Sequence, residues 1–137
     1  MNAATIQKYK NVTHAGLKLK VRDLVHPYVR RRDAENGCIS CPTGKVEQAG
    51  HFYAAGHFER LRYNLDNIHG QCLQCNYYKH GNLISYRINL EKKIGPERLE
   101  ALDREAALSK AERRFKFDRL TLIFIIEEYK QGRPYKP

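Results

Sequence analysis

The feature that most constrains the fold is a pair of CxxC motifs, one at Cys38 and Cys41 and the other at Cys72 and Cys75. They contain all four cysteines of the chain. Structural zinc sites are tetrahedral, and four thiolates are a common ligand set. The motifs therefore predict a structural zinc that ties two distant segments together and leaves no coordination position for a catalytic water.

Reduced thiols without a metal, or a redox pair, are the alternatives for these cysteines. A redox pair is expected in a βαβ context, which the surrounding sequence does not suggest. We find no segment like a signal peptide and no apolar run near the ~18 residues that cross a membrane. We therefore expect a cytoplasmic protein without membrane contact, in which disulfides are disfavoured and a metal is the better explanation.

The charge of the chain favours a polyanionic partner. Its 25 Lys and Arg exceed its 15 Asp and Glu, for a net charge of +10. Nucleic acid is the simplest such partner, because neutralising phosphates releases counterions. The alternative is an ordinary solvated basic surface. The basic helix predicted before residue 33 likewise either faces phosphate or is an amphipathic helix with a basic solvent face.

The periodicity of apolar residues predicts one α+β domain over residues 1–137. Residues 1–15 are polar and without periodicity, so we expect a loose arm or a fraying turn. Helical spacing follows from Leu17, and Pro27 either kinks that helix or begins a second one. Strands are expected at 46–53 and 67–71. A helix from about residue 73, interrupted at 81–82, continues to residue 95.

Two further helices are expected in residues 96–131. Pro96 suits a helix start, and the capping box at residues 109–112 predicts that a new helix begins there. The apolar run at residues 122–126 is either a dimer surface or ordinary core. Residues 38–82 thus form a zinc-bound centre between N-terminal and C-terminal helices.

The residues of this centre resemble a nuclease motif. The order CxxC, strand, Gly-His, Asn and CxxC-Asn is similar to the HNH, or ββα-metal, fold. More specifically, QAGHF (residues 48–52), LRYNLDN (61–67) and QCLQCN (71–76) resemble the NinG/Rap family of lambdoid-phage recombination endonucleases. The resemblance extends over about residues 24–102.

The resemblance implies a fold, an activity and roles. The fold would be a small zinc-bound ββα-metal (HNH-like) centre flanked by helices. The activity would be metal-dependent cleavage of branched DNA, such as Holliday junctions or D-loops, in the host cytoplasm. His51 would be the general base, Asn67 would orient it, and Asn76 would bind Mg²⁺ or Mn²⁺. Gly50 stands where many HNH enzymes have an Asp ligand, and Asn76 stands where the last His usually is. With Asn76 as the sole protein ligand, the resemblance implies a weakly held, hydrated ion.

Several other residues near this centre have alternative roles. His57 is a further metal ligand or a phosphate contact, and His80 is a further ligand because it follows Asn76 by one helical turn. His69 faces either side of its strand, and for each of the three a surface or packed histidine is the alternative. Tyr53, Tyr77 and Tyr78 either stack on unpaired bases or pack in the core. The residues expected to contact phosphate are Arg30, Arg31, Arg32, Arg60, Arg62, Lys79 and Arg87.

The near two-fold symmetry of a junction favours a homodimer. Two other functions use the same cysteines and basic surface. One is a non-catalytic, zinc-stabilised DNA-binding module, which the missing Asp ligand favours. The other is an RNA-binding zinc protein.

Overall fold

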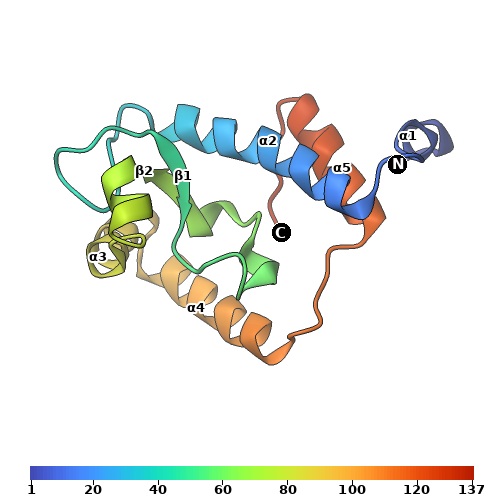
Figure 1. Cartoon of the computed structure of the whole chain (residues 1–137). Helices are drawn as coiled ribbons and strands as arrows, with labels where there is room; N and C mark the ends of the chain where they lie inside the picture. Colours follow the sequence, from blue (N-terminus) through green and yellow to red (C-terminus); the bar gives the residue numbers. More distant parts are fainter.

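Helix α2 (His14–Asp33) lies across the small sheet in the computed structural model, which describes residues 1–137 (Figure 1). Its stripe of Leu17, Val21, Val25 and Val29 is fully buried against both strands and α5. The helix continues through Pro27, so the alternative in which Pro27 begins a second helix is wrong, and the kink stays a prediction. A proline inside a helix costs about 3 kcal/mol. Burial of the flanking valines, at about 1.5–3 kcal/mol each, offsets it.

The sheet has two antiparallel strands, β1 (Gln48–His51) and β2 (Ile68–Gln71). Both lie within the predicted strands, and His51 pairs with Ile68 while Gln48 pairs with Gln71. The connecting loop contains the 3₁₀ turns η1 (Glu59–Leu61) and η2 (Leu65–Asn67). The chain is therefore α+β, as predicted.

The predicted helix after β2 is divided in two. A π-helical turn, η3 (Gln74–Tyr78), comes first, and α3 (Leu83–Ile94) follows. Gly81 and Asn82 separate them with φ of 94° and 47°, a left-handed conformation that suits glycine and tolerates asparagine. The predicted break at 81–82 is confirmed.

Helix α4 (Pro96–Ala111) begins at the predicted proline, and α5 (Arg119–Lys130) follows it. The helix start predicted at Ser109 is wrong, because α4 runs through that residue and buries its side chain. The N-cap of α5 is Asp118, which accepts a hydrogen bond from the N–H of Thr121. The local capping pattern was overridden by the packing of Ser109 in the fold.

The apolar run of α5 is core. Its residues are at most 1% exposed apart from Phe124, which is 44% exposed, and the helix packs against α2. The run is thus not a free dimer surface. Residues 1–15 are not a loose arm either, because Ala3–Lys8 form α1 and the buried Tyr9 donates a 2.7 Å hydrogen bond to Glu127.

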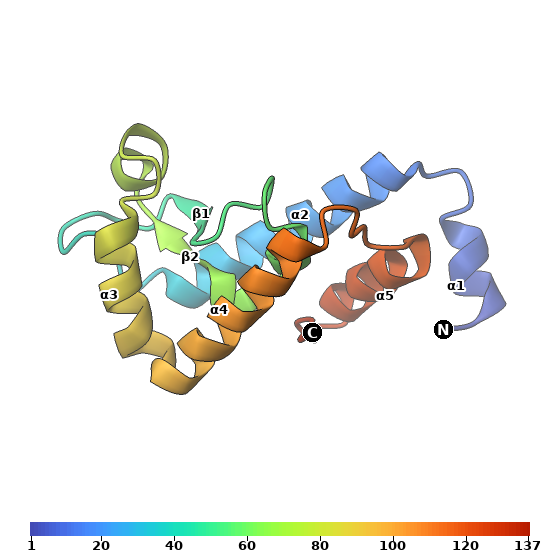
Figure 2. The same cartoon turned by 90° about the horizontal axis from the view of Figure 1, so that it is seen from below.

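Two apolar cores lie on opposite sides of the sheet. One is formed chiefly by α2 and α5, and the other by α3 and α4 with residues of the interstrand loop. Helix α4 accordingly lies on the side of the sheet away from α2, and α1 is at the far end from α3 (Figures 1 and 2). None of the helices is long and apolar enough to cross a membrane.

A buried carboxylate joins the layers. Asp33, only 1% exposed, accepts hydrogen bonds from Arg32, Lys93 and the N–H of Gly70. Burial alone would raise the pKa of Asp33, but these donors hold it well below its usual range. The ionised carboxylate ties the end of α2 to β2 and α3.

Candidate functional site

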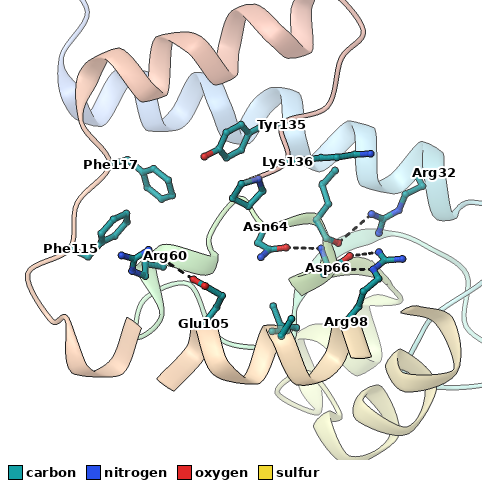
Figure 3. Close-up of a pocket in the computed structure, with 14 residues that line it drawn as sticks. Arg32, Arg60, Asn64, Asp66, Arg98, Glu105, Phe115, Phe117, Tyr135 and Lys136 are labelled. Carbon is teal, nitrogen blue, oxygen red and sulfur yellow. Dashed lines mark hydrogen bonds and ion pairs between the residues drawn. The ribbon is translucent and has the colours of Figure 1, made fainter. Parts of the chain in front are cut away.

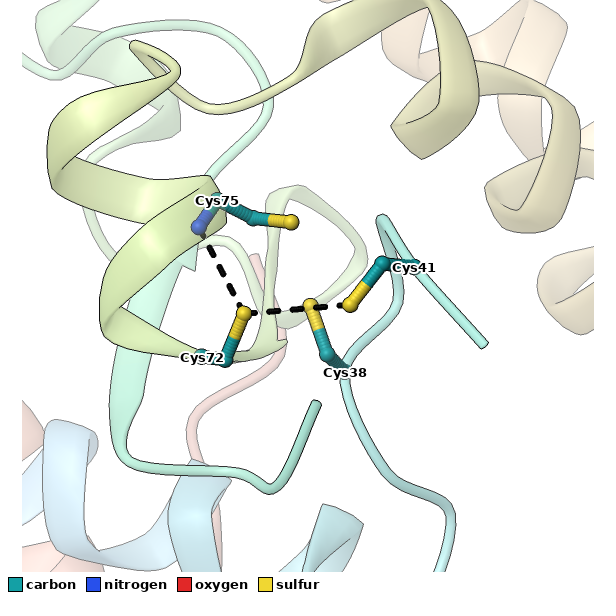
Figure 4. Close-up of side chains that lie close together, drawn as sticks. All are labelled: Cys38, Cys41, Cys72 and Cys75. Carbon is teal, nitrogen blue, oxygen red and sulfur yellow. Dashed lines mark hydrogen bonds between the residues drawn. The ribbon is translucent and has the colours of Figure 1, made fainter. Parts of the chain in front are cut away.

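The four cysteines converge between residues 38–41 and the start of η3 (Figure 4). Their sulfurs lie within 4.8 Å of one another, and those of Cys41 and Cys72 are 3.8 Å apart. A tetrahedral zinc with Zn–S bonds of about 2.3 Å separates its sulfurs by about 3.8 Å. The four cysteines can therefore hold a zinc ion, as the sequence predicted.

The local backbone suits thiolate ligands. Each sulfur accepts one N–H hydrogen bond at 3.3–3.6 Å, and three of the four donors are backbone groups. Gly44 is confined there, because a Cβ would lie 2.7 Å from the sulfur of Cys72 and 2.8 Å from that of Cys41. A zinc bound here would anchor η3, the turn that carries Asn76.

His51 ends β1 with its imidazole held in one orientation. Its Nε2 lies 2.9 Å from the carbonyl oxygen of Arg62. A carbonyl only accepts, so Nε2 carries the proton and Nδ1 is the basic nitrogen. Burial lowers the pKa of His51 below its ordinary value of 6.5, so the ring is neutral at neutral pH. The side chain is equipped to accept a proton.

His26 of α2 is a neighbour of His51 that the sequence did not reveal. The two ring centroids are 5.9 Å apart in an edge-on arrangement. Burial, followed by the charge that His51 would carry, lowers the pKa of His26 to about 4. Because α2 and β1 are distant in the chain, no local pattern signalled this contact.

Asn67 is fully buried and fixes the interstrand loop. Its Oδ1 accepts from the N–H of Tyr53 at 2.8 Å, and its Nδ2 donates to the carbonyls of Tyr53 and Leu61 at 2.9 and 3.2 Å. The loop runs directly into Arg62, whose carbonyl holds His51. These bonds hold the loop, and the role of Asn67 in orienting a catalytic base stays a prediction.

Asn76 lies in η3, and Gln48 sets the orientation of its carboxamide. The Nδ2 of Asn76 donates to the Oε1 of Gln48 at 2.6 Å. Its Oδ1 lies on the side of Gly50 where a side chain would project, 2.9 Å from the position that a Cβ would occupy. Tyr86, fully buried in α3, donates a 2.7 Å hydrogen bond to the carbonyl of Gly50 and supports this strand end.

The other histidines lie apart from this arrangement. His69 is buried, and its two nitrogens contact Arg32 at 3.2 Å and the carbonyl of Asp66 at 2.9 Å. Burial and nearby cations lower its pKa to about 3, so it is a neutral core residue. His57 and His80 are exposed. His80 follows the end of η3 in a turn, so the helical spacing to Asn76 is absent.

The basic residues predicted to contact nucleic acid fall into two groups. Four form ion pairs within the chain: Arg32 with Asp33, Arg60 with Glu112, Arg62 with Glu59 and Arg87 with Asp103. Arg30, Arg31 and Lys79 take part in no ion pair of the structure. Tyr77 and Tyr78, next to Lys79, are 67% and 62% exposed, whereas Tyr53 packs between Phe52 and Phe58.

A cleft of about 740 Å³ between α2, α4 and the C-terminal tail is separate from this arrangement (Figure 3). It is lined by none of the cysteines, His51 or Asn76. Its arginines at 32, 60 and 98 are bound to carboxylates of the chain. Of its basic lining residues only Lys136 is outside an ion pair, so the cleft offers a single free positive side chain.

A family model described as "NinG: Bacteriophage Lambda NinG protein" matches residues 2–132. Among similar proteins, "Protein ninG" of Escherichia phage lambda is 38% identical over 86 residues, which cover 61% of this chain and 42% of that protein. "Protein ninG" of Salmonella phage P22 is 40% identical over 78 residues, covering 56% and 38%.

The aligned part of the chain thus spans about two fifths of the length of these relatives. No solved structure matches the chain.

Proposed function

The chain belongs to the NinG family of bacteriophage proteins, and from that premise we propose that it is a metal-dependent endonuclease acting on branched DNA. One observation carries the proposal. His51, a neutral histidine with a free Nδ1, ends β1, and the Oδ1 of Asn76 lies beside Gly50 of the same strand. A base and an oxygen ligand for a hard cation are two of the groups that phosphodiester hydrolysis needs.

His51 would take the proton of the attacking water. Its neutral ring is ready at neutral pH because burial lowers its pKa, and the carbonyl of Arg62 stabilises the imidazolium that forms. Asn67 would keep that carbonyl in place through its three side-chain bonds. A positioned general base contributes roughly 10²–10⁴-fold to such a reaction.

Asn76 would hold the cation. Its amide oxygen is a suitable ligand for Mg²⁺ or Mn²⁺, which favour oxygen and leave room for several waters. A cation there would neutralise charge on the phosphate and the leaving oxygen. Successive side chains of a strand alternate in direction, so we place the phosphate across the end of β1, between His51 and the oxygen of Asn76.

Arg30, Arg31 and Lys79 would bind DNA phosphates, since their charge is not consumed by ion pairs. The exposed rings of Tyr77 and Tyr78 suit stacking on unpaired bases. Selectivity for a branch rests on the resemblance to the recombination endonucleases and on these two rings. A junction with near two-fold symmetry would take two copies, one for each strand to be cut.

Nicking of a synthetic four-way junction, with and without Mg²⁺, tests this function. We expect cleavage only with the metal, and His51→Ala should lower the rate about 10²–10⁴-fold while binding persists. His57→Ala is the matched control, because that histidine is exposed in the same interstrand region. A His51→Ala variant that cleaves at the normal rate would exclude the proposed base.

The same assay separates the competing functions. Tight binding without cleavage, with each of several divalent ions, would identify a zinc-stabilised DNA-binding module. Preference for RNA over the junction in direct competition would identify an RNA-binding protein. If linear duplex is cleaved as fast as the junction, the proposed branch selectivity is wrong and the proposed nuclease activity is still supported.

A further inference from the structure

Gln71 has a buried oxygen without a partner. The side chain, at the end of β2, is fully buried, and its Oε1 has no hydrogen bond in the structure. An unsatisfied buried acceptor costs about 1–3 kcal/mol. Buried acceptors of this kind are normally satisfied by a protein group, an ordered water or an ion.

The orientation of this amide is settled by its surroundings. The Nε2 of Gln71 donates to the carbonyl of Gly81 and to the hydroxyl of Ser40, each at 2.8 Å. A carbonyl cannot donate, so Oε1 could not exchange places with Nε2 without setting two acceptors against each other. The hydroxyl of Ser40 itself donates to the same carbonyl at 3.0 Å. Oε1 is therefore held on the opposite side.

On that side Oε1 faces the position where Gly50 would carry a side chain. A Cβ on Gly50 would stand 1.7 Å from Oε1 of Gln71 and 2.9 Å from Oδ1 of Asn76. The two oxygens therefore lie no more than 4.6 Å apart, the limit set by these two distances. Two oxygens on one Mg²⁺ at about 2.1 Å from it are separated by about 3–4.2 Å. A small adjustment of either amide would bring both onto one ion.

We propose that Oε1 of Gln71 is a second protein ligand, beside Asn76, for the divalent cation of the site. The identity of the cation rests on the proposed endonuclease function. The motif that the chain resembles often has an Asp immediately before its histidine. Here that position is Gly50, and the amide of Gln71 fills the space where such a side chain would begin.

The exchange of a carboxylate for a neutral amide lowers the affinity of the site for a divalent cation. Two amide oxygens bring no negative charge, so they bind a divalent cation weakly on their own. Phosphate oxygens of bound DNA supply the missing charge. We therefore expect the affinity for the cation to rise sharply when DNA is bound.

Mn²⁺ binding, followed by its electron paramagnetic resonance signal, tests the ligand directly. The parent protein is His51→Ala with zinc and a four-way junction bound, so that cleavage is slowed about 10²–10⁴-fold during the measurement. Gln71→Met keeps the length of the side chain but offers a soft sulfur, and it should weaken Mn²⁺ binding roughly tenfold or more. Binding within twofold of the parent, at full zinc content, would overturn the proposal.

Ser40→Ala is the matched control. It removes a partner of the Nε2 of Gln71 but leaves Oε1 in place, so Mn²⁺ affinity should stay within twofold of the parent. A tenfold loss in this variant would show that the Gln71 network acts through structure, against the proposal. The double variant Gly50→Asp with Gln71→Ala should regain affinity, because alanine clears the space that the new carboxylate needs.

A crystal of the unmodified chain soaked with excess Mn²⁺, enough to fill a weak site without DNA, keeps the test independent of variant folding. The anomalous peak should lie within about 2.3 Å of Oε1 of Gln71. A water at Oε1, with the ion elsewhere, would overturn the proposal.

The proposal that Gln71 is a metal ligand and the proposal that the chain is an endonuclease can be refuted separately. Loss of Mn²⁺ in Gln71→Met, without cleavage of any junction by the unmodified protein, would keep the ligand and reject the endonuclease. Metal-dependent cleavage by the unmodified protein that Gln71→Met retains in full, with normal Mn²⁺ affinity, would keep the endonuclease and reject the ligand.

Discussion

Replacing Asn67 with alanine should both destabilise the chain and slow any cleavage that depends on His51. The side chain makes three hydrogen bonds, all to backbone groups of the interstrand loop. Without it, the N–H and the carbonyl of Tyr53 lose their side-chain partner. The carbonyl of Leu61 keeps a bond from the N–H of Asn64 at 3.2 Å.

The magnitude follows from these two backbone groups. An unsatisfied buried group costs about 1–3 kcal/mol. Tyr53 is half-buried, so water restores part of the loss, and we expect about 2–4 kcal/mol in all. That is a large fraction of the ~5–15 kcal/mol by which a domain is stable. The carbonyl of Arg62 would also shift, and we expect kcat to fall about 10–100-fold.

Urea unfolding at fixed zinc concentration measures the first effect, and cleavage of the junction measures the second. Asn64→Ala is the control, since that side chain makes a single bond, to the N–H of Asp66 at 2.9 Å, and should cost only about 1 kcal/mol. If Asn67→Ala changes stability by less than about 0.5 kcal/mol, the loop is not held by this side chain. A fall in kcat without a change in stability would instead indicate that Asn67 positions the carbonyl of Arg62 without stabilising the loop.

Three further outcomes are expected. Gly44→Ala should lose zinc to a chelator at lower concentration than the unmodified chain, because its Cβ would lie within 2.8 Å of two sulfurs; equal zinc retention would contradict the tight packing. His69 has a folded pKa of about 3 against 6.5 when free, so the unfolded chain binds the proton first as pH falls. Thermal stability should then be full above pH 6.5 and decline toward pH 3, and a melting temperature constant across that window would argue against a buried neutral ring. Arg31→Ala should weaken junction binding and reduce its salt slope by about one, whereas Arg62→Ala, which breaks an ion pair with Glu59, should leave the slope unchanged.

The sequence alone predicted what depends on residue type and short spacing. Two CxxC motifs specify the ligands of a zinc, because each motif presents two thiolates from one turn. Pro96 and the residues at 81–82 marked helix boundaries, because their backbone preferences act locally. The strand positions followed from the same kind of signal, and the structure agrees with each of these.

Local sequence signals predicted the wrong helix boundaries where tertiary packing was stronger. The proline of α2 suggested the start of a second helix, yet the valines on either side of it are buried and the helix is continuous. The capping box at Ser109 reads as a helix start, yet that residue is buried inside α4. In both cases the tertiary contacts outweigh a local preference of a few kcal/mol at most.

Only the tertiary structure decided how the candidate site is built. The pairing of Gln48 with Gln71 and the absence of a Cβ at Gly50 bring the oxygens of Gln71 and Asn76 together. The packing of α2 places His26 against His51. Ion pairs with acids distant in the chain engage Arg60 and Arg87, two of the seven basic residues expected at phosphate. These contacts join residues far apart in the chain, and they depend on strand register and helix packing, which residue spacing does not specify.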